Sequence, residues 1–261
     1  MENSNSKKDT EISGKKIFFL YPSAVIQNEI AFDLTQQEYE VYFTREHINL
    51  RSVLKQFPDS VVFINLDDGL SGKDWDNWIR SIQADPTMAS VALGVITAVK
   101  NDDSSQKYSA MGLKGGYTVI NKMDISKTII GLMEILKAND AHGRRKFLRA
   151  TTTGHEELTS INIPHNGQYY KGVINDISVA GLSCVFVPDP DLEKNSLCKD
   201  IQIKLHSTIL KGEGIVFGSR MEGMMKVYVF IFTQRIDPEV RTKIRSFIQS
   251  IMQAKMDNLL K

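Results

Sequence analysis

Short apolar runs alternate with amphipathic stretches between residue 15 and about residue 137. Apolar residues recur at helical spacing between the runs, as in Trp75, Ile79 and Ile82. Such alternation predicts a parallel, doubly wound α/β sheet covered by helices. The five runs with the length of buried strands span residues 16–21, 40–43, 61–66, 91–97 and 115–120. The helical stretches span residues 22–37, about 50–54, 75–82 and 125–136.

The pattern changes after residue 143, where helical spacing gives way to short β-rich runs separated by turn residues. These runs predict six antiparallel strands that close into a small β-barrel. The expected strands span residues 159–163, 169–174, 181–187, 201–205, 209–217 and 227–232. Beyond Pro238, apolar positions from Val240 to Leu260 form one helical stripe. We interpret it as a C-terminal helix that caps the barrel; a dimerisation helix, and hence a homodimer, is the alternative left open.

These patterns divide the chain into four segments. We expect residues 1–14 to form a polar, disordered tail, residues 15–137 an α/β domain, residues 138–142 a linker, and residues 143–261 the barrel domain with its helix. Small and polar residues dominate the linker, and four cations lie among the six residues from Arg144 to Arg149. We therefore expect the chain from Asn139 to Arg149 to be mobile when no ligand is bound.

Composition narrows the function classes. The chain has 261 residues, of which 42% are hydrophobic, and 32 Lys and Arg balance 31 Asp and Glu. No global charge favours nucleic acid or an anionic membrane, and no apolar run is long enough to span a bilayer, so we expect a cytoplasmic protein. Cys184 and Cys198 lack metal or redox spacing and are expected to be reduced and structural. The histidines do not cluster, so no metal is expected.

Two short motifs carry the candidate chemistry. Arg145 and Arg149 form an RxxxR pattern, and Asp176, Ser178 and Gly181 form DxSxxG. Arginine grips phosphate with two parallel hydrogen bonds and also stacks on purines. Aspartate accepts from the paired donor edge of guanine, serine adds a hydroxyl, and glycine permits a positive φ or a close backbone approach. The alternative for DxSxxG is a turn in which Asp176 and Ser178 only cap the loop backbone.

RxxxR alone is a weak signal. Arg241 and Arg245 repeat the spacing within the C-terminal helix, where we interpret them as part of a solvated helix face.

Together the two motifs, about thirty residues apart, resemble the signature of the PilZ family over residues 143–240. This resemblance implies a bacterial second-messenger receptor that binds cyclic di-GMP in a PilZ β-barrel. It assigns Arg145 and Arg149 to phosphates and guanine, Asp176 and Ser178 to a guanine edge, and Gly181 to the shape of the loop. Family members with an arginine directly before the motif tend to bind an intercalated pair of cyclic di-GMP molecules. In this sequence that residue is Arg144, so the resemblance implies two ligand molecules per chain.

Residues 15–137 resemble a response-regulator receiver domain. Thr97 lies where receivers carry a switch Thr or Ser, and Lys122 lies near their characteristic Lys. The acidic site is missing, because Tyr21, Pro22 and Ser23 follow the first strand and Asn65 ends the third. Without those acids nothing holds magnesium for phosphoryl transfer. We therefore predict a pseudo-receiver, with Asp67 and Asp68 in a solvated turn.

The favoured function is a cyclic di-GMP effector that changes its interdomain arrangement on binding and signals to an unidentified protein partner. Motility, exopolysaccharide and virulence control are family-level expectations. The alternatives are a phosphorylatable two-component regulator with a PilZ output domain and a PilZ scaffold that binds no nucleotide. No cofactor is expected. No nucleophile with a base and no phosphate-binding glycine loop appears in the sequence, so we expect no enzymatic activity.

Overall fold

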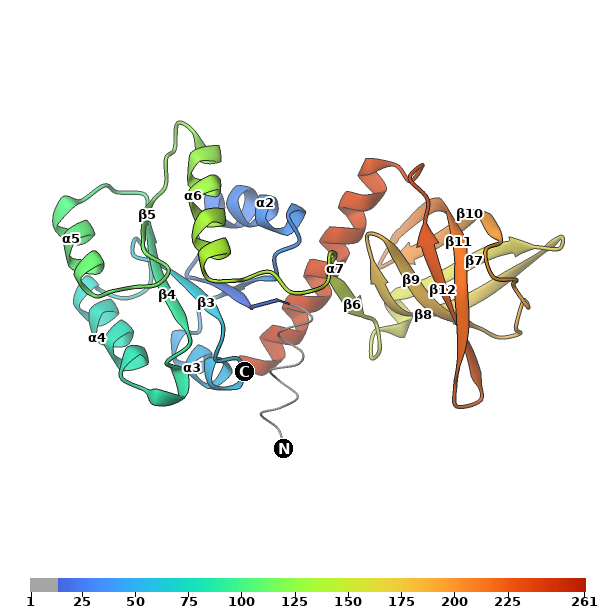
Figure 1. The fold of residues 1–261 in the computed structure, drawn as a ribbon, viewed down its shortest axis with the longest axis horizontal. Coiled ribbons are helices and arrows are strands. Elements are labelled where there is room, and N and C mark those ends of the chain that lie inside the picture. Colours follow the sequence, from blue (N-terminus) through green and yellow to red (C-terminus); the bar gives the residue numbers. More distant parts are fainter. Residues whose placement is uncertain (1–13) are drawn as a thin grey trace. The chain divides into compact units, whose positions relative to one another are not determined.

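The computed structural model describes residues 14–261 and divides the chain into two compact units (Figure 1). The first, the α/β unit, comprises the chain up to Lys146 together with Gln253–Lys261. The second, the barrel unit, comprises Phe147–Met252. The predicted polar tail lies outside the described residues except for Gly14. The sequence pattern predicts a barrel domain that begins at residue 143 and includes the whole C-terminus, whereas the barrel unit begins at Phe147 and ends at Met252.

The α/β unit is built on a parallel sheet with the strand order β2-β1-β3-β4-β5. This order defines a doubly wound sheet in which the strand order reverses beside β1, as in receiver domains. Every residue of the central strands β1, β3 and β4 is buried, as expected for strands covered on both faces. The receiver-like fold is therefore confirmed. The strands are β1 (Ile17–Leu20), β2 (Val41–Thr44), β3 (Val61–Asn65), β4 (Ala92–Thr97) and β5 (Tyr117–Val119).

Helices cover both faces of this sheet. Figure 1 shows α2 and α6 over one face and α3 and α4 over the other. Leu34 of α2 and Leu132 of α6 join one buried cluster with alternate residues of the strands. Side chains cap two of the helices, because Ser71 accepts from the Asp74 N–H and Asn101 from the Ser104 N–H. The helices are α2 (Ala31–Gln36), which follows a π-helical turn (Ile26–Ile30), α3 (His47–Gln56), α4 (Gly72–Gln83), α5 (Asp102–Ala110) and α6 (Ile125–Ala138).

The segment after α6 is anchored to the α/β unit. Ala141 is buried, its N–H donates to the Leu136 carbonyl, and its carbonyl accepts from the Lys15 N–H at 2.9 Å. The His142 ring stacks on Tyr39 with 3.9 Å between the ring centroids. The sequence predicts a mobile linker here, because its small polar residues do not reveal the contacts with Lys15 and the buried Tyr39.

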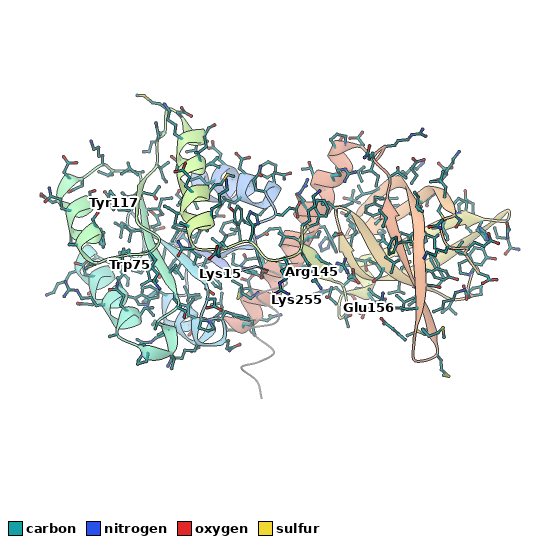
Figure 2. The ribbon with its side chains drawn as sticks, in the orientation of Figure 1. Lys15, Trp75, Tyr117, Arg145, Glu156 and Lys255 are labelled. Atoms are coloured by element: carbon teal, nitrogen blue, oxygen red, sulfur yellow. The ribbon has the colours of Figure 1, made fainter. Side chains whose placement is uncertain are left out.

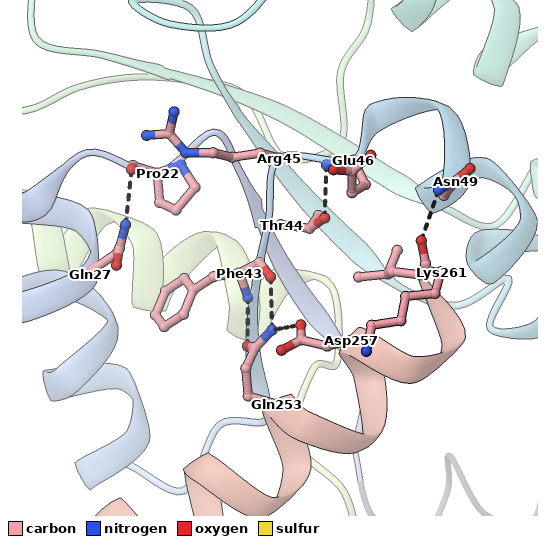
Figure 3. Close-up of a pocket in the computed structure, with 11 residues that line it drawn as sticks. Pro22, Gln27, Phe43, Thr44, Arg45, Glu46, Asn49, Gln253, Asp257 and Lys261 are labelled. Atoms are coloured by element: carbon pink, nitrogen blue, oxygen red, sulfur yellow. Dashed lines mark hydrogen bonds between the residues drawn. The ribbon is translucent and has the colours of Figure 1, made fainter.

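The C-terminal residues of the chain pack on the edge strand β2. The Gln253 side-chain amide accepts from the Phe43 N–H at 2.9 Å and donates to the Phe43 carbonyl at 2.8 Å (Figure 3). Asn49 donates to the Leu260 carbonyl at 2.8 Å, and the Leu260 side chain is buried. A pocket of about 780 Å³ lies beside these contacts, with Arg45 and Lys261 among its lining residues. The segment therefore satisfies backbone groups at one edge of the sheet.

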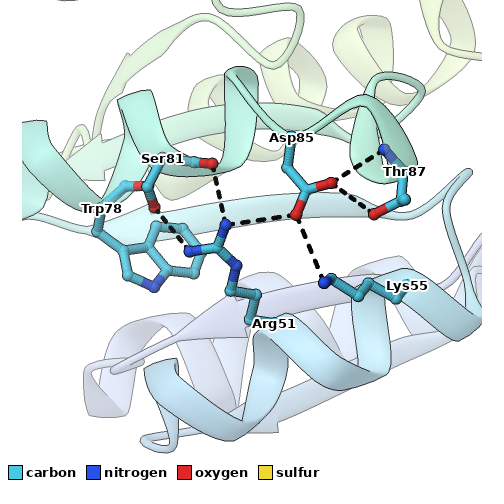
Figure 4. A network of polar contacts seen from close by, with 6 residues as sticks. All are labelled: Arg51, Lys55, Trp78, Ser81, Asp85 and Thr87. Carbon is cyan, nitrogen blue, oxygen red and sulfur yellow. Dashed lines mark hydrogen bonds and ion pairs between the residues drawn. The ribbon is translucent and has the colours of Figure 1, made fainter.

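A polar network joins α3 to the end of α4 (Figure 4). Arg51 contacts the Ser81 hydroxyl and carbonyl, and both Arg51 and Lys55 contact the Asp85 carboxylate, at 3.3 and 3.5 Å. Hydrogen bonds from the Thr87 hydroxyl and N–H, supported by these cations, lower the pKa of the Asp85 carboxyl to about 2. Asp85 therefore stays charged at any physiological pH and closes the loop after α4.

The barrel unit contains the predicted six-stranded antiparallel barrel. Its strands follow the order β8-β7-β10-β11-β12-β9, and β9 pairs back onto β8, which closes the sheet. Inward-facing residues such as Ile161, Ile203 and Phe230 fill the interior. The strands are β7 (Thr159–His165), β8 (Gln168–Ser178), β9 (Gly181–Phe186), β10 (Leu197–Leu205), β11 (Thr208–Glu222) and β12 (Met225–Phe232). A 3₁₀ turn (Glu156–Leu158) precedes them.

Two further elements complete the unit. A short strand, β6 (Arg149–Thr151), pairs with β8 outside the closed barrel and was not predicted. The predicted C-terminal helix, α7 (Pro238–Leu259), buries Ile244, Phe247 and Ile248 in the barrel core. Both cysteines are free and buried, and burial raises the pKa of the Cys184 thiol well above its usual range. No helix among residues 14–261 combines the length and apolarity needed to cross a bilayer.

Candidate functional site

Strand β6 places the second arginine of RxxxR beside the DxSxxG motif. It runs antiparallel to β8, with Arg149 opposite Ser178 and Thr151 opposite Asp176. Ala150, between the two outward residues, is buried in the barrel core and fixes the strand. The two motifs are distant in sequence, but a three-residue strand makes them neighbours.

Arg149 and Asp176 form an ion pair on the outside of the barrel. The Arg149 Nη1 lies 3.2 Å from the Asp176 Oδ1, and the other carboxylate oxygen accepts a hydrogen bond from the Ser183 hydroxyl of β9. About half of the Arg149 side chain remains exposed (47%), compared with 19% for Asp176. Because guanidinium carries five N–H donors, Arg149 can hold this carboxylate and still donate to an anion in solvent. Ser183 was not among the predicted residues.

Ser178 and Gly181 shape the turn that follows β8. The Ser178 hydroxyl donates to the Gly181 carbonyl at 3.1 Å and accepts from the Ala180 N–H at 3.3 Å, and its side chain is buried. A Cβ on Gly181 would lie 2.0 Å from the Phe230 carbonyl oxygen of β12. Glycine is therefore required at position 181 for close backbone approach and not for a positive φ. In the free protein these two residues serve the loop, as in the capping alternative, while Asp176 bonds outward to Arg149 and Ser183.

Arg144 and Arg145 are exposed and belong to the α/β unit, whereas Arg149 belongs to the barrel unit (Arg145 is labelled in Figure 2). The boundary between the units falls after Lys146, inside the RxxxR motif. Phe147 and Leu148 pack partly against the barrel core. The structure thus brings Arg149, Asp176, Ser178 and Gly181 together, and the contribution of the two preceding arginines stays a prediction.

The carboxyl edge of the α/β sheet, where the resemblance to receiver domains places a phosphorylation site, is filled by side chains. The Tyr21 ring lies where the receiver acids would follow β1 and makes edge contacts with Trp75. Gly69 covers the ring closely, since a Cβ there would lie 2.8 Å from it. Asn65, at the phosphoacceptor position, is buried and donates to the Tyr21 carbonyl at 2.8 Å. Aromatic and amide groups therefore occupy the space that a magnesium site needs.

Asp67 and Asp68 lie in an exposed turn, as the sequence predicts, and Asp67 also makes contacts outside that turn. Its carboxylate accepts from the Thr97 hydroxyl and from the Ala98 N–H, both at 2.6 Å. Asp68 forms an ion pair with Arg45 at 3.2 Å, where both side chains are well exposed. Asp67 thus joins the loops after β3 and β4, and its own oxygens occupy donors that could otherwise hold a phosphoryl group.

We expect no phosphoryl uptake when the protein is incubated with acetyl phosphate and magnesium, because Tyr21, Pro22 and Ser23 follow β1 in place of the acids that would hold the metal. Intact-mass spectrometry measures the result directly. The Asp67→Ala and Asp68→Ala variants serve as controls for the site of any modification. Uptake by the wild type that disappears in either variant would contradict this expectation and would restore the two-component alternative.

Comparison with known proteins gives structural matches only. No family model and no curated protein sequence matches the chain. Among solved structures, YcgR from Escherichia coli in complex with c-di-GMP matches 45% of this chain with 12% sequence identity and a TM-score of 0.39. The match covers 50% of YcgR, so this chain corresponds to about half of that protein.

Two other solved structures also match parts of this chain. The complex of K. pneumonia MrkH with c-di-GMP matches 45% of this chain and 57% of MrkH, with 19% identity and a TM-score of 0.39. The Mn(2+)-bound response regulator Rcp1 matches over 46% of this chain and 92% of its own length, with 18% identity and a TM-score of 0.38. The matched structures therefore include two c-di-GMP complexes and a response regulator.

Proposed function

We propose that the protein is a cyclic di-GMP receptor of the PilZ type whose ligand binds on the barrel unit. The observation that carries the proposal is the ion pair between Arg149 and Asp176, which joins RxxxR to DxSxxG on adjacent strands. A cyclic dinucleotide offers two phosphates and two guanine edges. An exposed guanidinium beside an outward carboxylate matches one anionic and one donor-bearing group of such a ligand.

The side chains divide this work. Arg149 binds a phosphate or the guanine face, and Asp176 accepts from the guanine donor edge while Ser183 and Arg149 fix its orientation. Ser178 and Gly181 act on the ligand by holding the turn between β8 and β9 in shape. Arg144 and Arg145 close over the ligand from the N-terminal side of β6, and Arg144 favours a pair of ligand molecules per chain.

Ligand binding then changes the relation between the units. The unit boundary lies within RxxxR, so a ligand that binds these arginines acts on the chain segment that connects the units. Neutralising the cations on either side of Lys146 removes their mutual repulsion and orders the connection. The result is a new surface for a protein partner, with motility, exopolysaccharide or virulence control as the process inferred from the resemblance.

Isothermal titration of the purified full chain with cyclic di-GMP tests the proposal. We expect selective binding with a dissociation constant in the micromolar range or below, and a stoichiometry near two if Arg144 acts as proposed. GTP and cyclic di-AMP are the ligand controls, since each lacks either the cyclic backbone or the guanine edge. No heat and no thermal shift with cyclic di-GMP would refute the receptor and favour a PilZ scaffold without nucleotide.

A further inference from the structure

We propose that Arg241 of α7 is a positioning residue for the ligand loop, the turn of Val179 and Ala180 between β8 and β9. Its guanidinium donates from Nη1 to the Val179 carbonyl at 3.1 Å and from Nη2 to the Thr233 carbonyl at 3.3 Å. Val179 lies inside DxSxxG, between Ser178 and Gly181. The inference rests on the proposed function, because the loop matters only if it binds the nucleotide. Sequence analysis interpreted Arg241 as solvated, and the structure instead directs it at two backbone carbonyls.

The loop is short, and few contacts hold it. Only Val179 and Ala180 separate β8 from β9, and the Val179 side chain is buried in the barrel core. The Ala180 carbonyl accepts from the Phe232 N–H at 2.9 Å, and the Val179 carbonyl accepts from Arg241. Elements outside the β8–β9 hairpin thus bind both loop carbonyls. The contact to Ala180 comes from the Phe232 backbone, whereas the contact to Val179 comes from the Arg241 side chain. A substitution can therefore remove the Arg241 contact without breaking the sheet.

The position of the Arg241 guanidinium is fixed by the packing of α7 on the barrel. Arg241 lies in the first turn of α7, and its N–H donates to the Asp237 carbonyl. One turn further on, Ile244 is fully buried in the barrel core and fixes the helix. The second carbonyl bound by Arg241 belongs to Thr233, whose hydroxyl donates to Glu213 of β11 at 2.8 Å. The Arg241 guanidinium therefore links the ligand loop to Thr233, which is itself bound to β11.

Arginine suits this task for a geometric reason. Its planar fork presents two nitrogens in fixed directions, so it can hold two carbonyls at once, whereas lysine offers a single ammonium on a flexible stem. Both side chains carry the same charge. Arg241→Lys therefore removes the bridging geometry and leaves the electrostatic attraction for an anionic ligand almost unchanged.

The experiment measures association and dissociation rates of cyclic di-GMP with the full-length Arg241→Lys variant at several salt concentrations. We expect the dissociation rate to rise about five- to tenfold, which corresponds to the net contribution of one typical hydrogen bond, with an association rate within about twofold of wild type. The salt dependence should stay that of the wild type. Lys243→Gln is the control, because Lys243 lies on the same helix turn, is exposed and pairs with Glu239.

Amide hydrogen exchange of Ala180 in the free protein gives a second readout. It should be faster in Arg241→Lys than in Lys243→Gln, because Arg241 binds the Val179 carbonyl whereas Lys243 pairs with Glu239. Unchanged dissociation and exchange rates would overturn the role of Arg241. A changed association rate with a weaker salt dependence would also overturn it, because it would mark Arg241 as a direct phosphate contact. Absence of binding by the wild type is a different result and would refute the proposed function.

Discussion

Arg149→Ala weakens cyclic di-GMP binding by about a hundredfold or more in our expectation, which corresponds to the loss of one or two hydrogen bonds from a charged donor. The substitution removes the exposed guanidinium that would grip the ligand. It also leaves Asp176 without its cation at 3.2 Å, so that the carboxylate is less well oriented toward a guanine edge. Isothermal titration of the variant beside the wild type measures the effect.

Arg220→Ala is the matched control for this measurement. Arg220 is also a half-exposed arginine of the barrel unit in an ion pair, with Glu222 at 2.7 Å, but it lies on the β11–β12 hairpin. Its loss should change ligand affinity by less than about twofold, since surface ion pairs contribute little. Arg145→Ala, unlike this control, should abolish binding. Its melting temperature should stay at the wild-type value, because the Arg145 side chain is exposed. Wild-type affinity in Arg149→Ala would disprove the assignment of the site.

Gly181→Ala is expected to destabilise the barrel unit by about 3 kcal/mol or more, the upper range for overpacking a well-packed site. A Cβ at this position would lie 2.0 Å from the Phe230 carbonyl oxygen, and both groups are backbone atoms of paired strands, β9 and β12. The strands would have to separate where the barrel closes. Urea unfolding followed by circular dichroism measures the loss.

Gly218→Ala controls for replacing a strand glycine. Gly218 lies in β11 at an irregularity of the β11–β12 pairing, and a Cβ there would meet open space. We expect its free energy of unfolding to stay within about 0.5 kcal/mol of wild type. If Gly181→Ala unfolded at the same urea concentration as the wild type, the glycine of DxSxxG would have no structural reason to be glycine.

The elements that the sequence predicted are those whose pattern is set by burial alone. The central strands of the α/β sheet are buried on both faces, so they appear as continuous apolar runs such as residues 61–65. Helix α5 was missed because Tyr108 is the one residue it buries, which leaves no apolar stripe. Strand β6 was missed because it is three residues long and begins with a charged residue that the motif had assigned to a ligand.

The candidate site was predicted in composition but not in geometry. Residue types and spacing selected Arg149 and Asp176 separately, as ligands for different parts of a nucleotide. Their ion pair depends on the register between β6 and β8, which tertiary packing of Ala150 determines and no local pattern encodes. The same holds for Asp67, whose partners are Thr97 at the end of β4 and Ala98 directly after it. Contacts between segments distant in sequence were the information that spacing could not supply.

The contact between the Gln253 amide and the backbone of strand β2 determines where the chain can be cut into fragments. An outer strand with free N–H and C=O groups invites pairing with other molecules, and proteins commonly cover such strands. Here one glutamine near the end of the chain covers the backbone of Phe43. A fragment that ends after α6 would therefore carry an uncovered strand and a tendency to self-associate. Expression of the α/β unit as an independent fragment needs a substitute for those last nine residues.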